Sequence, residues 1–416
     1  MIKITKAAAA IICLTRLGIC SGFSQISVSG DLQLFISGQI DGLPSSGSAV
    51  YNDPTEDQQT IWAEALNLFY SGNYSSAHEK LSSVDYRLID FEDTESDNSF
   101  YVISRVSGGF NYWGTYVYNQ LACRDLVLQA PHPKYDTNTG DQAFFTFLEL
   151  NARTYFLSGT HRCNSSLASE CSGTTTACGS SAPFKISDPA HNDVSMFQLT
   201  TDLHHEHYTE DVFIQFHGFG KQSTDPNAIL SNGTRETPET DYIDLLIVEM
   251  LKDDASLEFK AAHLDQSWDR LIAFTNTQGR LLNQSSDPCS QSASLSSGQF
   301  IHIEQEKDLF RATKAGWQKW IAPMSRVFDC KQAILKSEIL DESIVYPVPF
   351  DDHLSFQVKS NASRLLVYSM AGEMIVEKYP TDWGAIDLSE LEVGTYVYQI
   401  QDKQSNTIYR GKVVKK

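Results

Sequence analysis

Between residues 84 and 328, short apolar runs alternate with stretches of helical pattern, and this alternation constrains the fold more than any other feature. The segments that carry it are 125–130, 141–150, 154–157, 211–216 and 300–303. Such alternation is typical of an α/β domain with a mostly parallel or mixed central sheet flanked by helices. In these domains catalytic side chains gather beyond the carboxyl ends of the strands. We therefore expect functional residues directly after the apolar runs.

The chain is expected to begin with a cleavable signal peptide over residues 1–24. Lys3 and Lys6 supply positive charge, residues 7–14 are continuously apolar, and small residues precede Gln25. These are the parts of a secretory signal, and the apolar stretch is too short to span a bilayer. No other segment reaches the ~20 apolar residues of a membrane helix, so the sequence predicts export without a membrane span.

Residues 25–83 form the next predicted segment. The runs 26–29 and 32–36 have strand character, and apolar residues between 60 and 81 recur at the spacing of one amphipathic helix. We expect this helix to be a satellite of the main α/β domain, which we place at residues 84–334.

After about residue 335, short alternating strands separated by turn residues predict a small antiparallel β-sandwich over residues 335–416. Its motifs are Pro-x-Pro-Phe ending at Phe350, Val-Tyr-x-x-x-Gly ending at Gly372, Leu-x-x-Gly-x-Tyr ending at Tyr396, and the basic end 412–416. In this order they resemble the C-terminal sorting domain of the type IX secretion system. The resemblance implies the type IX machinery as a partner, passage through the periplasm, and a secreted or cell-surface location.

The formal net charge of -20 excludes one class of partner. An acidic field repels phosphate backbones, and no run of Lys or Arg offsets it, so we expect no nucleic acid partner. The sequence also lacks a Gly-x-Ser-x-Gly elbow, a Walker loop and a Gly-x-Gly-x-x-Gly fingerprint. Serine hydrolase, NTPase and dinucleotide-binding functions are therefore not expected.

Of the 8 cysteines, Cys13 and Cys20 fall in the predicted signal peptide, which leaves six in the exported chain. An even number in an oxidising compartment predicts three disulfides, and the sequence leaves their pairing open. Cys163, Cys171 and Cys178 lie in a Ser/Thr/Gly-rich loop without the paired spacing of a metal knuckle. We expect these three to form disulfides as well.

Two histidines follow predicted strands and point to a metal site. The run 125–130 leads into His132 and Asp136, and His217 comes directly after the run that ends at residue 216. Two histidines and one carboxylate are a protein ligand set that leaves an open position on zinc for water. We predict Zn²⁺ as the cofactor, with these three side chains as its ligands.

Other polar residues near the predicted strand ends have chemistry that fits the same site. Glu304 directly follows the run 300–303, where a carboxylate can act as general base toward a zinc-activated water. Glu306 competes for this role. Arg162 can stabilise an oxyanion, and together with Asn164 it can bind a substrate carboxylate.

The remaining histidines are less decisive. His191 and His161 stay open as alternatives to Asp136 for the third metal ligand. A cluster of three histidines lies in a polar stretch of helical character, and we expect its members, His204, His205 and His207, to be solvated.

The order of these groups over residues 125–330 resembles the zinc carboxypeptidase-like superfamily, which includes carboxypeptidases, aspartoacylase-type deacylases, poly-γ-glutamate hydrolases and N-formylglutamate amidohydrolases. The chain departs from the carboxypeptidase pattern in the first pair, which is His-x-x-x-Asp rather than His-x-x-Glu. The resemblance implies a secreted zinc-dependent hydrolase of amide bonds, acting on a peptide or on a small molecule such as an N-acyl amino acid. The alternative is a metal-free secreted or cell-surface binding or adhesion protein with the same fold.

Overall fold

The computed structural model describes residues 26–331, except residue 97, and residues 344–416, except 359–361, 370–372 and 404–406. The chain divides into two compact units, Met1–Lys331 and Gln332–Lys416. The predicted signal peptide, residues 1–24, lies outside the described residues, as does the predicted boundary near residue 335.

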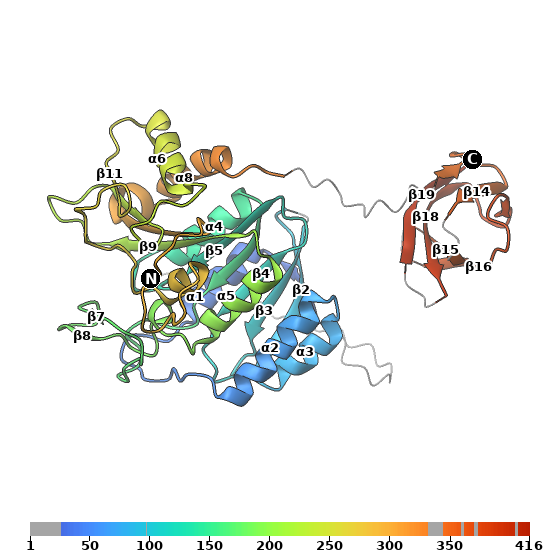
Figure 1. Cartoon of the computed structure of the whole chain (residues 1–416). Helices are drawn as coiled ribbons and strands as arrows, with labels where there is room; N and C mark the ends of the chain where they lie inside the picture. The colour runs from blue at the N-terminus through green and yellow to red at the C-terminus, as the bar shows by residue number, and fades with distance from the viewer. Residues whose placement is uncertain (1–25, 97, 332–343, 359–361, 370–372, 404–406) are drawn as a thin grey trace, which may run out of the picture. The chain divides into compact units, whose positions relative to one another are not determined.

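The large unit is built on a ten-stranded sheet with the strand order β1-β2-β3-β4-β6-β5-β9-β12-β10-β11 (Figure 1). The bounds of its strands are β1 Ile26–Gly30, β2 Tyr86–Asp93, β3 Ser99–Arg105, β4 Thr115–Asn119, β5 Arg124–Ala130, β6 Ala152–Leu157, β9 Val212–Phe219, β10 Ala228–Ser231, β11 Phe259–Ala261 and β12 Phe300–Glu306. The central strands β6, β5, β9 and β12 pair in parallel, whereas β2, β3 and β4 pair antiparallel. The predicted mixed sheet is confirmed.

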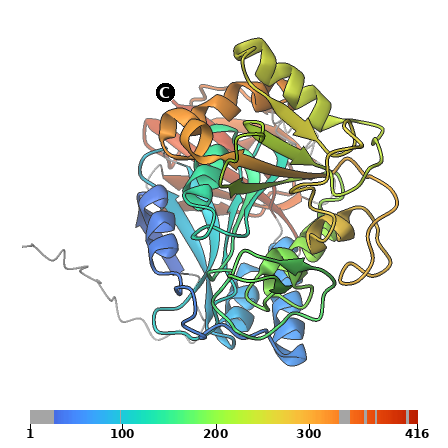
Figure 2. The same cartoon turned by 90° about the vertical axis from the view of Figure 1, so that its left-hand side faces the viewer.

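Helices cover both faces of this sheet (Figure 2). Their bounds are α1 Leu32–Asp41, α2 Glu56–Tyr70, α3 Tyr74–Ser82, α4 Thr139–Glu149, α5 Met196–His207, α6 Tyr242–Asp253, α7 Thr277–Leu282 and α8 Lys314–Val327, with the short turns η1 Pro189–His191 and η2 Lys307–Arg311. Buried side chains of α1, α4, α6 and α8 form one core with the sheet. Those of α2, α3, α5 and α7 form a second core on the other face.

Alternation along the central strands separates the two cores. In β9, Val212, Ile214 and Phe216 belong to the core that contains α4, and Phe213 belongs to the core that contains α5. Successive side chains of a strand point to opposite faces, so His217 lies on the same face as Phe213. The parallel neighbour β12 pairs with β9 in register. The predicted functional residues of these strands therefore share the α5 face.

The N-terminal segment differs from the prediction at two places. The run 32–36, predicted as extended, is the start of α1, because Leu32, Ile36 and Ile40 recur at helical spacing and are all buried. Asp31 caps this helix by accepting a hydrogen bond from the backbone N–H of Leu34. The run 26–29 does form a strand, β1, which pairs in parallel with β2.

The single helix predicted over residues 60–81 is instead two helices, α2 and α3. Gly72 between them has φ +77°, a backbone conformation that interrupts a right-handed helix. Asn73 then caps α3 through its side chain, which accepts from the N–H of Ser76. The apolar periodicity continues across the break because both helices pack on the same core, and this is why the pattern did not reveal the break.

The small unit contains antiparallel strands in two sheets, ordered β13-β14-β17 and β16-β15-β18-β19. The bounds of its strands are β13 Ile344–Tyr346, β14 His353–Gln357, β15 Ala362–Ser369, β16 Met374–Lys378, β17 Ile386–Asp387, β18 Gly394–Asp402 and β19 Thr407–Lys415. Side chains from both sheets, among them Leu354, Val367 and Ile400, form one buried core. Two sheets around one core make a β-sandwich, which confirms the prediction.

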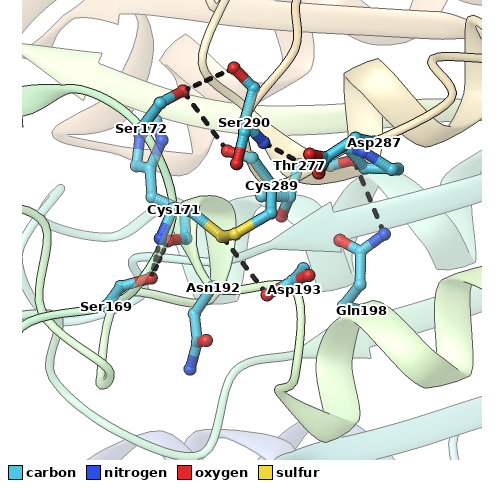
Figure 3. The surroundings of a disulfide bond; sticks show 12 residues. Ser169, Cys171, Ser172, Asn192, Asp193, Gln198, Thr277, Asp287, Cys289 and Ser290 are labelled. Atoms are coloured by element: carbon cyan, nitrogen blue, oxygen red, sulfur yellow. Dashed lines mark hydrogen bonds between the residues drawn. A yellow bond between two sulfur atoms is a disulfide. The ribbon is translucent and has the colours of Figure 1, made fainter.

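The described residues contain three disulfides, as the cysteine count predicted, and the pairs are Cys123–Cys330, Cys163–Cys178 and Cys171–Cys289. The first joins the beginning of β5 to the chain after α8. The other two hold the irregular segment between β6 and α5, which includes the short strands β7 Thr174–Thr175 and β8 Ala182–Pro183. Figure 3 shows the third disulfide beside Asp193, whose Oδ1 lies 3.2 Å from Cys171 Sγ.

We expect the disulfide with the longest sequence separation to contribute most to stability. Cys123 and Cys330 are separated by 207 residues, against 15 for Cys163 and Cys178. Replacing the first pair by serine should lower the free energy of unfolding by about 5 kcal/mol, and replacing the second pair by about 3 kcal/mol, because a longer loop loses more entropy on closure. Guanidinium denaturation of both variants measures this order, and equal losses would contradict it.

Candidate functional site

The parallel strands β5, β9 and β12 bring the predicted residues to one edge of the sheet. His132 follows the end of β5 by two residues, while His217 and Glu304 lie within β9 and β12 and are register partners. All three side chains are buried, with exposed fractions of 2%, 2% and 7%. The strand pairing therefore assembles residues that are distant in the sequence.

Three donor atoms meet at this edge. His132 Nδ1 lies 3.1 Å from His217 Nδ1, and Asp136 Oδ2 lies 3.2 Å from the first nitrogen and 3.3 Å from the second. Ligand atoms on a tetrahedral ion with bonds of ~2.0–2.1 Å are separated by about 3.3–3.4 Å. The three donor atoms are therefore spaced as the ligands of one small cation such as Zn²⁺ would be.

The hydrogen bonds behind the two imidazoles favour the same conclusion. His132 Nε2 lies 2.8 Å from Asp188 Oδ1, and His217 Nε2 lies 3.2 Å from Gln215 Oε1. Because carboxylate and amide oxygens only accept, both Nε2 atoms carry the proton and donate. When both imidazoles are neutral, each Nδ1 therefore presents a lone pair toward the centre of the cluster, where Asp136 also places a carboxylate oxygen. Such an arrangement of acceptors attracts a cation.

The charges around the cluster act differently on its three members. Burial, followed by the charge of Arg162, opposes protonation of His132, but Asp188 and Asp136 outweigh both and raise its pKa. Burial lowers the pKa of His217 to about 4, so this imidazole is neutral at neutral pH. Although burial opposes ionisation of Asp136, its close contacts with the two histidines hold its pKa well below the usual range.

Asp188 connects the cluster to Arg162. The guanidinium donates through Nε and Nη2 to Asp188 Oδ2, over 3.0 and 2.5 Å. Its third nitrogen, Nη1, lies 3.4 Å from His132 Nδ1. Arg162 also lines the cavity beside the cluster, so one edge of the guanidinium is anchored and the other faces the site.

Glu304 lies on the far side of His217 from Asp136 in the strand order. Burial, and next the charge of Asp136, raise the pKa of its carboxyl well above the usual value. Its Oε2 and the Nδ1 of neighbouring His302 are buried, and each lacks a hydrogen-bond partner among the described residues. The His302 ring lies 4.2 Å from that of His217. Unpaired buried polar atoms are costly, so these two are available to a bound water or substrate.

The cluster opens into a cavity of about 730 Å³. Its walls include residues 174–177, residues 217–220 and the loop 269–276. In that loop Leu271 and Ala273 have φ +58° and +59°, which strains residues that carry a Cβ. A cavity of this size accommodates a small peptide or an acylated amino acid.

Asn164, predicted to bind substrate, is placed elsewhere. Its Oδ1 accepts from the N–H groups of Val50 and Tyr51, and its Nδ2 donates to Ser45 O and Ser48 Oγ. The side chain does not line the cavity. Its hydrogen-bonding capacity is used to hold the segment before α2, so we do not retain it as a substrate ligand.

The alternative third ligands, His191 and His161, are not in the donor cluster. His191 lines the cavity, donates from Nδ1 to Thr275 O at 2.8 Å and stacks on Phe184. His161 Nδ1 accepts from the N–H of Cys163. The competing base Glu306 instead pairs with Lys221 and Asn227. Geometry therefore favours Asp136 and Glu304 over their alternatives.

The histidines of α5 are only partly solvated. His207 is exposed, whereas His204 is completely buried, and its Nε2 lies 2.9 Å from Asp211 Oδ2. The expectation of a solvated His204 was wrong because the inward face of α5 packs on Phe156 and Phe213. His204 is a core residue, and His205 is intermediate in burial.

Three residues of the site, Asp188, Gln215 and His302, were given no role from the sequence. A usable signal existed for two of them, because Gln215 and His302 stand two positions before His217 and Glu304 on the same faces of their strands. Asp188 lies in irregular chain that reaches the site only in the folded structure.

Comparison with known proteins identifies the small unit. Residues 344–416 match the family described as the secretion system C-terminal sorting domain. The predicted sorting domain is thereby confirmed, and it marks the protein as secreted or located at the cell surface. In the described part of the chain no helix combines the length and apolarity needed to cross a membrane.

The large unit has weaker likenesses. No curated protein sequence matches the chain. The N-formylglutamate amidohydrolase from Ralstonia eutropha JMP134 is 10% identical, with a TM-score of 0.32, and the match covers 52% of this chain and 95% of that one. A putative carboxypeptidase A from Shewanella denitrificans OS-217 is 10% identical, with a TM-score of 0.29, covering 67% and 70%. Likenesses of this size leave the activity to be argued from the residues themselves.

We expect Asp188 to control the metal affinity of the cluster through His132. Asp188→Asn should weaken zinc binding by about 10–100-fold, the usual effect of removing a carboxylate behind a ligating histidine. Competition with a chromophoric chelator measures the affinity on protein whose circular dichroism shows that it is folded. Asp269→Asn is the matched control, since this residue lines the cavity but does not contact the cluster. Equal affinities in the two variants would contradict the role of Asp188.

Proposed function

We propose that this protein is a secreted zinc-dependent hydrolase of amide bonds. The observation that carries the proposal is the meeting of His132 Nδ1, His217 Nδ1 and Asp136 Oδ2 within 3.1–3.3 Å of one another. The hydrogen bonds on the outer sides of both imidazoles leave lone pairs on the inner side. A set of two histidines and one carboxylate beside an open cavity is the arrangement that catalytic zinc sites use.

In this proposal His132, Asp136 and His217 hold the ion. When bound, zinc would polarise a carbonyl oxygen and lower the pKa of a water molecule toward neutrality. Asp188 and Gln215 keep the two imidazoles in the tautomer and orientation that ligation requires.

Glu304 would be the general base. Its Oε2 has no partner among the described residues and the side chain lines the cavity, so in its ionised form it can take a proton from the attacking water. Because burial raises the pKa of this carboxyl, it can hold that proton and return it to the departing amine. The two transfers balance, and Glu304 ends the cycle as it began.

Arg162 would stabilise negative charge on the reacting group. Nε and Nη2 are committed to Asp188, which fixes the plane of the guanidinium, and Nη1 remains directed at the cluster. A donor held in advance at the place where an oxyanion develops lowers the barrier without reorganisation. The same nitrogen could instead bind a substrate carboxylate, which fits peptides and N-acyl amino acids as the substrate class.

The sorting domain supplies the route to the substrate. We propose that residues 344–416 engage the type IX secretion machinery and play no part in hydrolysis, since every group assigned above belongs to residues 132–304.

We expect His132→Ala and His217→Ala to remove zinc and activity together, because each deletes one of three protein ligands. Plasma emission analysis of the purified mature protein should find one zinc per chain in the wild type and less than about a tenth of that in either variant. His161→Ala is the matched control and should keep its zinc. A wild-type protein without stoichiometric metal would favour the metal-free binding or adhesion function instead.

We expect Glu304→Gln to separate metal binding from turnover. The amide preserves the shape of the side chain but cannot accept the proton, so kcat should fall by at least ~10²-fold while the zinc content stays unchanged. The assay is hydrolysis of a panel of N-acyl amino acids and short peptides. Glu306→Gln, which removes a charge two residues away, should keep wild-type kcat. Full activity in the first variant would transfer the base role to another residue.

A further inference from the structure

A second pocket lies at the same edge of the sheet as the metal cluster, several strands away. It has a volume of about 240 Å³ and is formed by the start of β2, the end of β3, the start of β4, the turn after β6 and the end of α1. The pairings Tyr86 with Arg105 and Thr115 with Leu157 place these strand ends together. None of the groups assigned to hydrolysis lines it.

This pocket is cationic in a strongly acidic protein. Arg87 and Arg105 line it, and no Asp or Glu is found among the described residues of its wall, although the chain has a net charge of -20. Five of its residues are glycines, Gly38, Gly42, Gly108, Gly114 and Gly159. At Gly38 and Gly108 the space that a Cβ would occupy is open, so a ligand can approach the backbone closely there.

The partners of the two arginines are incomplete. Arg87 has one weak contact, from Nε to Ser104 Oγ at 3.5 Å, and Arg105 donates from Nη1 to Gly109 O and stacks on Tyr112. Neither forms an ion pair with a described residue. Elsewhere in the described chain, Arg153, Arg162, Arg270, Arg326 and Arg364 pair with carboxylates. Four further arginines without an ion pair in that part of the chain, Arg124, Arg235, Arg280 and Arg311, instead each donate at least two hydrogen bonds to backbone carbonyl oxygens.

Arg87 thus carries a half-buried positive charge without a counter-charge. Burial alone lowers its pKa, and no neighbouring carboxylate offsets that effect. A charge removed from water without a partner is destabilising. An anion that entered the pocket would remove this cost, and a planar guanidinium suits an oxyanion because it can donate two parallel hydrogen bonds.

We propose that this pocket binds a compact oxyanion, a phosphate, sulfate or carboxylate group, with Arg87 as its principal ligand and Arg105 adding positive charge. The volume suffices for such a group and a small attached moiety. The inference does not depend on the proposed hydrolase activity.

The pocket is also connected to the catalytic cavity through the chain. Gly159 lines the pocket and Arg162, three residues later, lines the cavity. Lys134, two residues after His132, donates to the carbonyl oxygens of Asp41 and Leu43 at the pocket wall, both over 2.9 Å. The oxyanion can therefore be a free ion or an anionic group on an extended substrate, and the two sources need separate measurements.

The first test is calorimetric titration of the full exported protein with inorganic phosphate. Arg87→Gln should weaken binding by about tenfold or more, because a charge-assisted hydrogen-bonding group is lost. Gln39→Glu, an isosteric change in the same wall, should also weaken it by placing a carboxylate there. Arg326→Gln alters the net charge equally but belongs to α8 and an existing ion pair, so it should bind phosphate as the wild type does.

His132→Ala should retain full phosphate affinity, because His132 does not line this pocket. The result therefore tests oxyanion binding independently of the proposed hydrolase function. To test whether the oxyanion is a group on an extended substrate, the KM values of substrates with and without a remote phosphate or carboxylate are compared. If the anionic group lowers KM in the wild type but not in Arg87→Gln, the pocket binds part of the substrate. Phosphate binding that is absent, or that survives both Arg87→Gln and Gln39→Glu, would overturn the proposal.

Discussion

The parallel pairing of β5, β9 and β12 is the constraint on which the rest of the structure depends. Glu304 stands opposite His217, and Gln129 stands opposite Gln215, so the polar residues of three strands share one face at one edge. A slip of one residue in either pairing would turn one set of side chains into the apolar core on the other face. The register is fixed by burial on both sides of the sheet. The relative positions of the side chains in the site are therefore fixed as well.

A buried polar network below the cluster is a second consequence of this register. Gln215 donates to Gln129 and Gln278 and accepts from Asn276 and His217. Each such group would cost about 1–3 kcal/mol if it were buried without a partner, so the network stabilises only as a complete set. The complete network orients His217. The unpaired polar atoms, Glu304 Oε2 and His302 Nδ1, belong instead to residues that line the cavity.

Most of the residues that line the cavity lie outside the strands that carry His217, His302 and Glu304. They come from long irregular segments, and two disulfides, Cys163–Cys178 and Cys171–Cys289, restrain the segment between β6 and α5. Asp188 reaches His132 from this segment, and the strained residues Leu271 and Ala273 lie in the facing loop. Irregular chain has no periodic pattern, and for that reason the walls, unlike the strands, could not be predicted from the sequence.

The sequence by itself determined the mixed sheet, the sorting domain and the number of disulfides, because hydrophobic alternation and local order depend on neighbouring residues. It also placed His132, His217 and Glu304 near the carboxyl ends of three strands, although β9 and β12 continue past residues 216 and 303 to Phe219 and Glu306. Only the tertiary structure decided that Asp188 joins the site, that Asn164 is used elsewhere and that His204 is buried. These three outcomes depend on contacts between segments far apart in the chain. A local pattern of residue types does not indicate which distant polar group a buried side chain will contact.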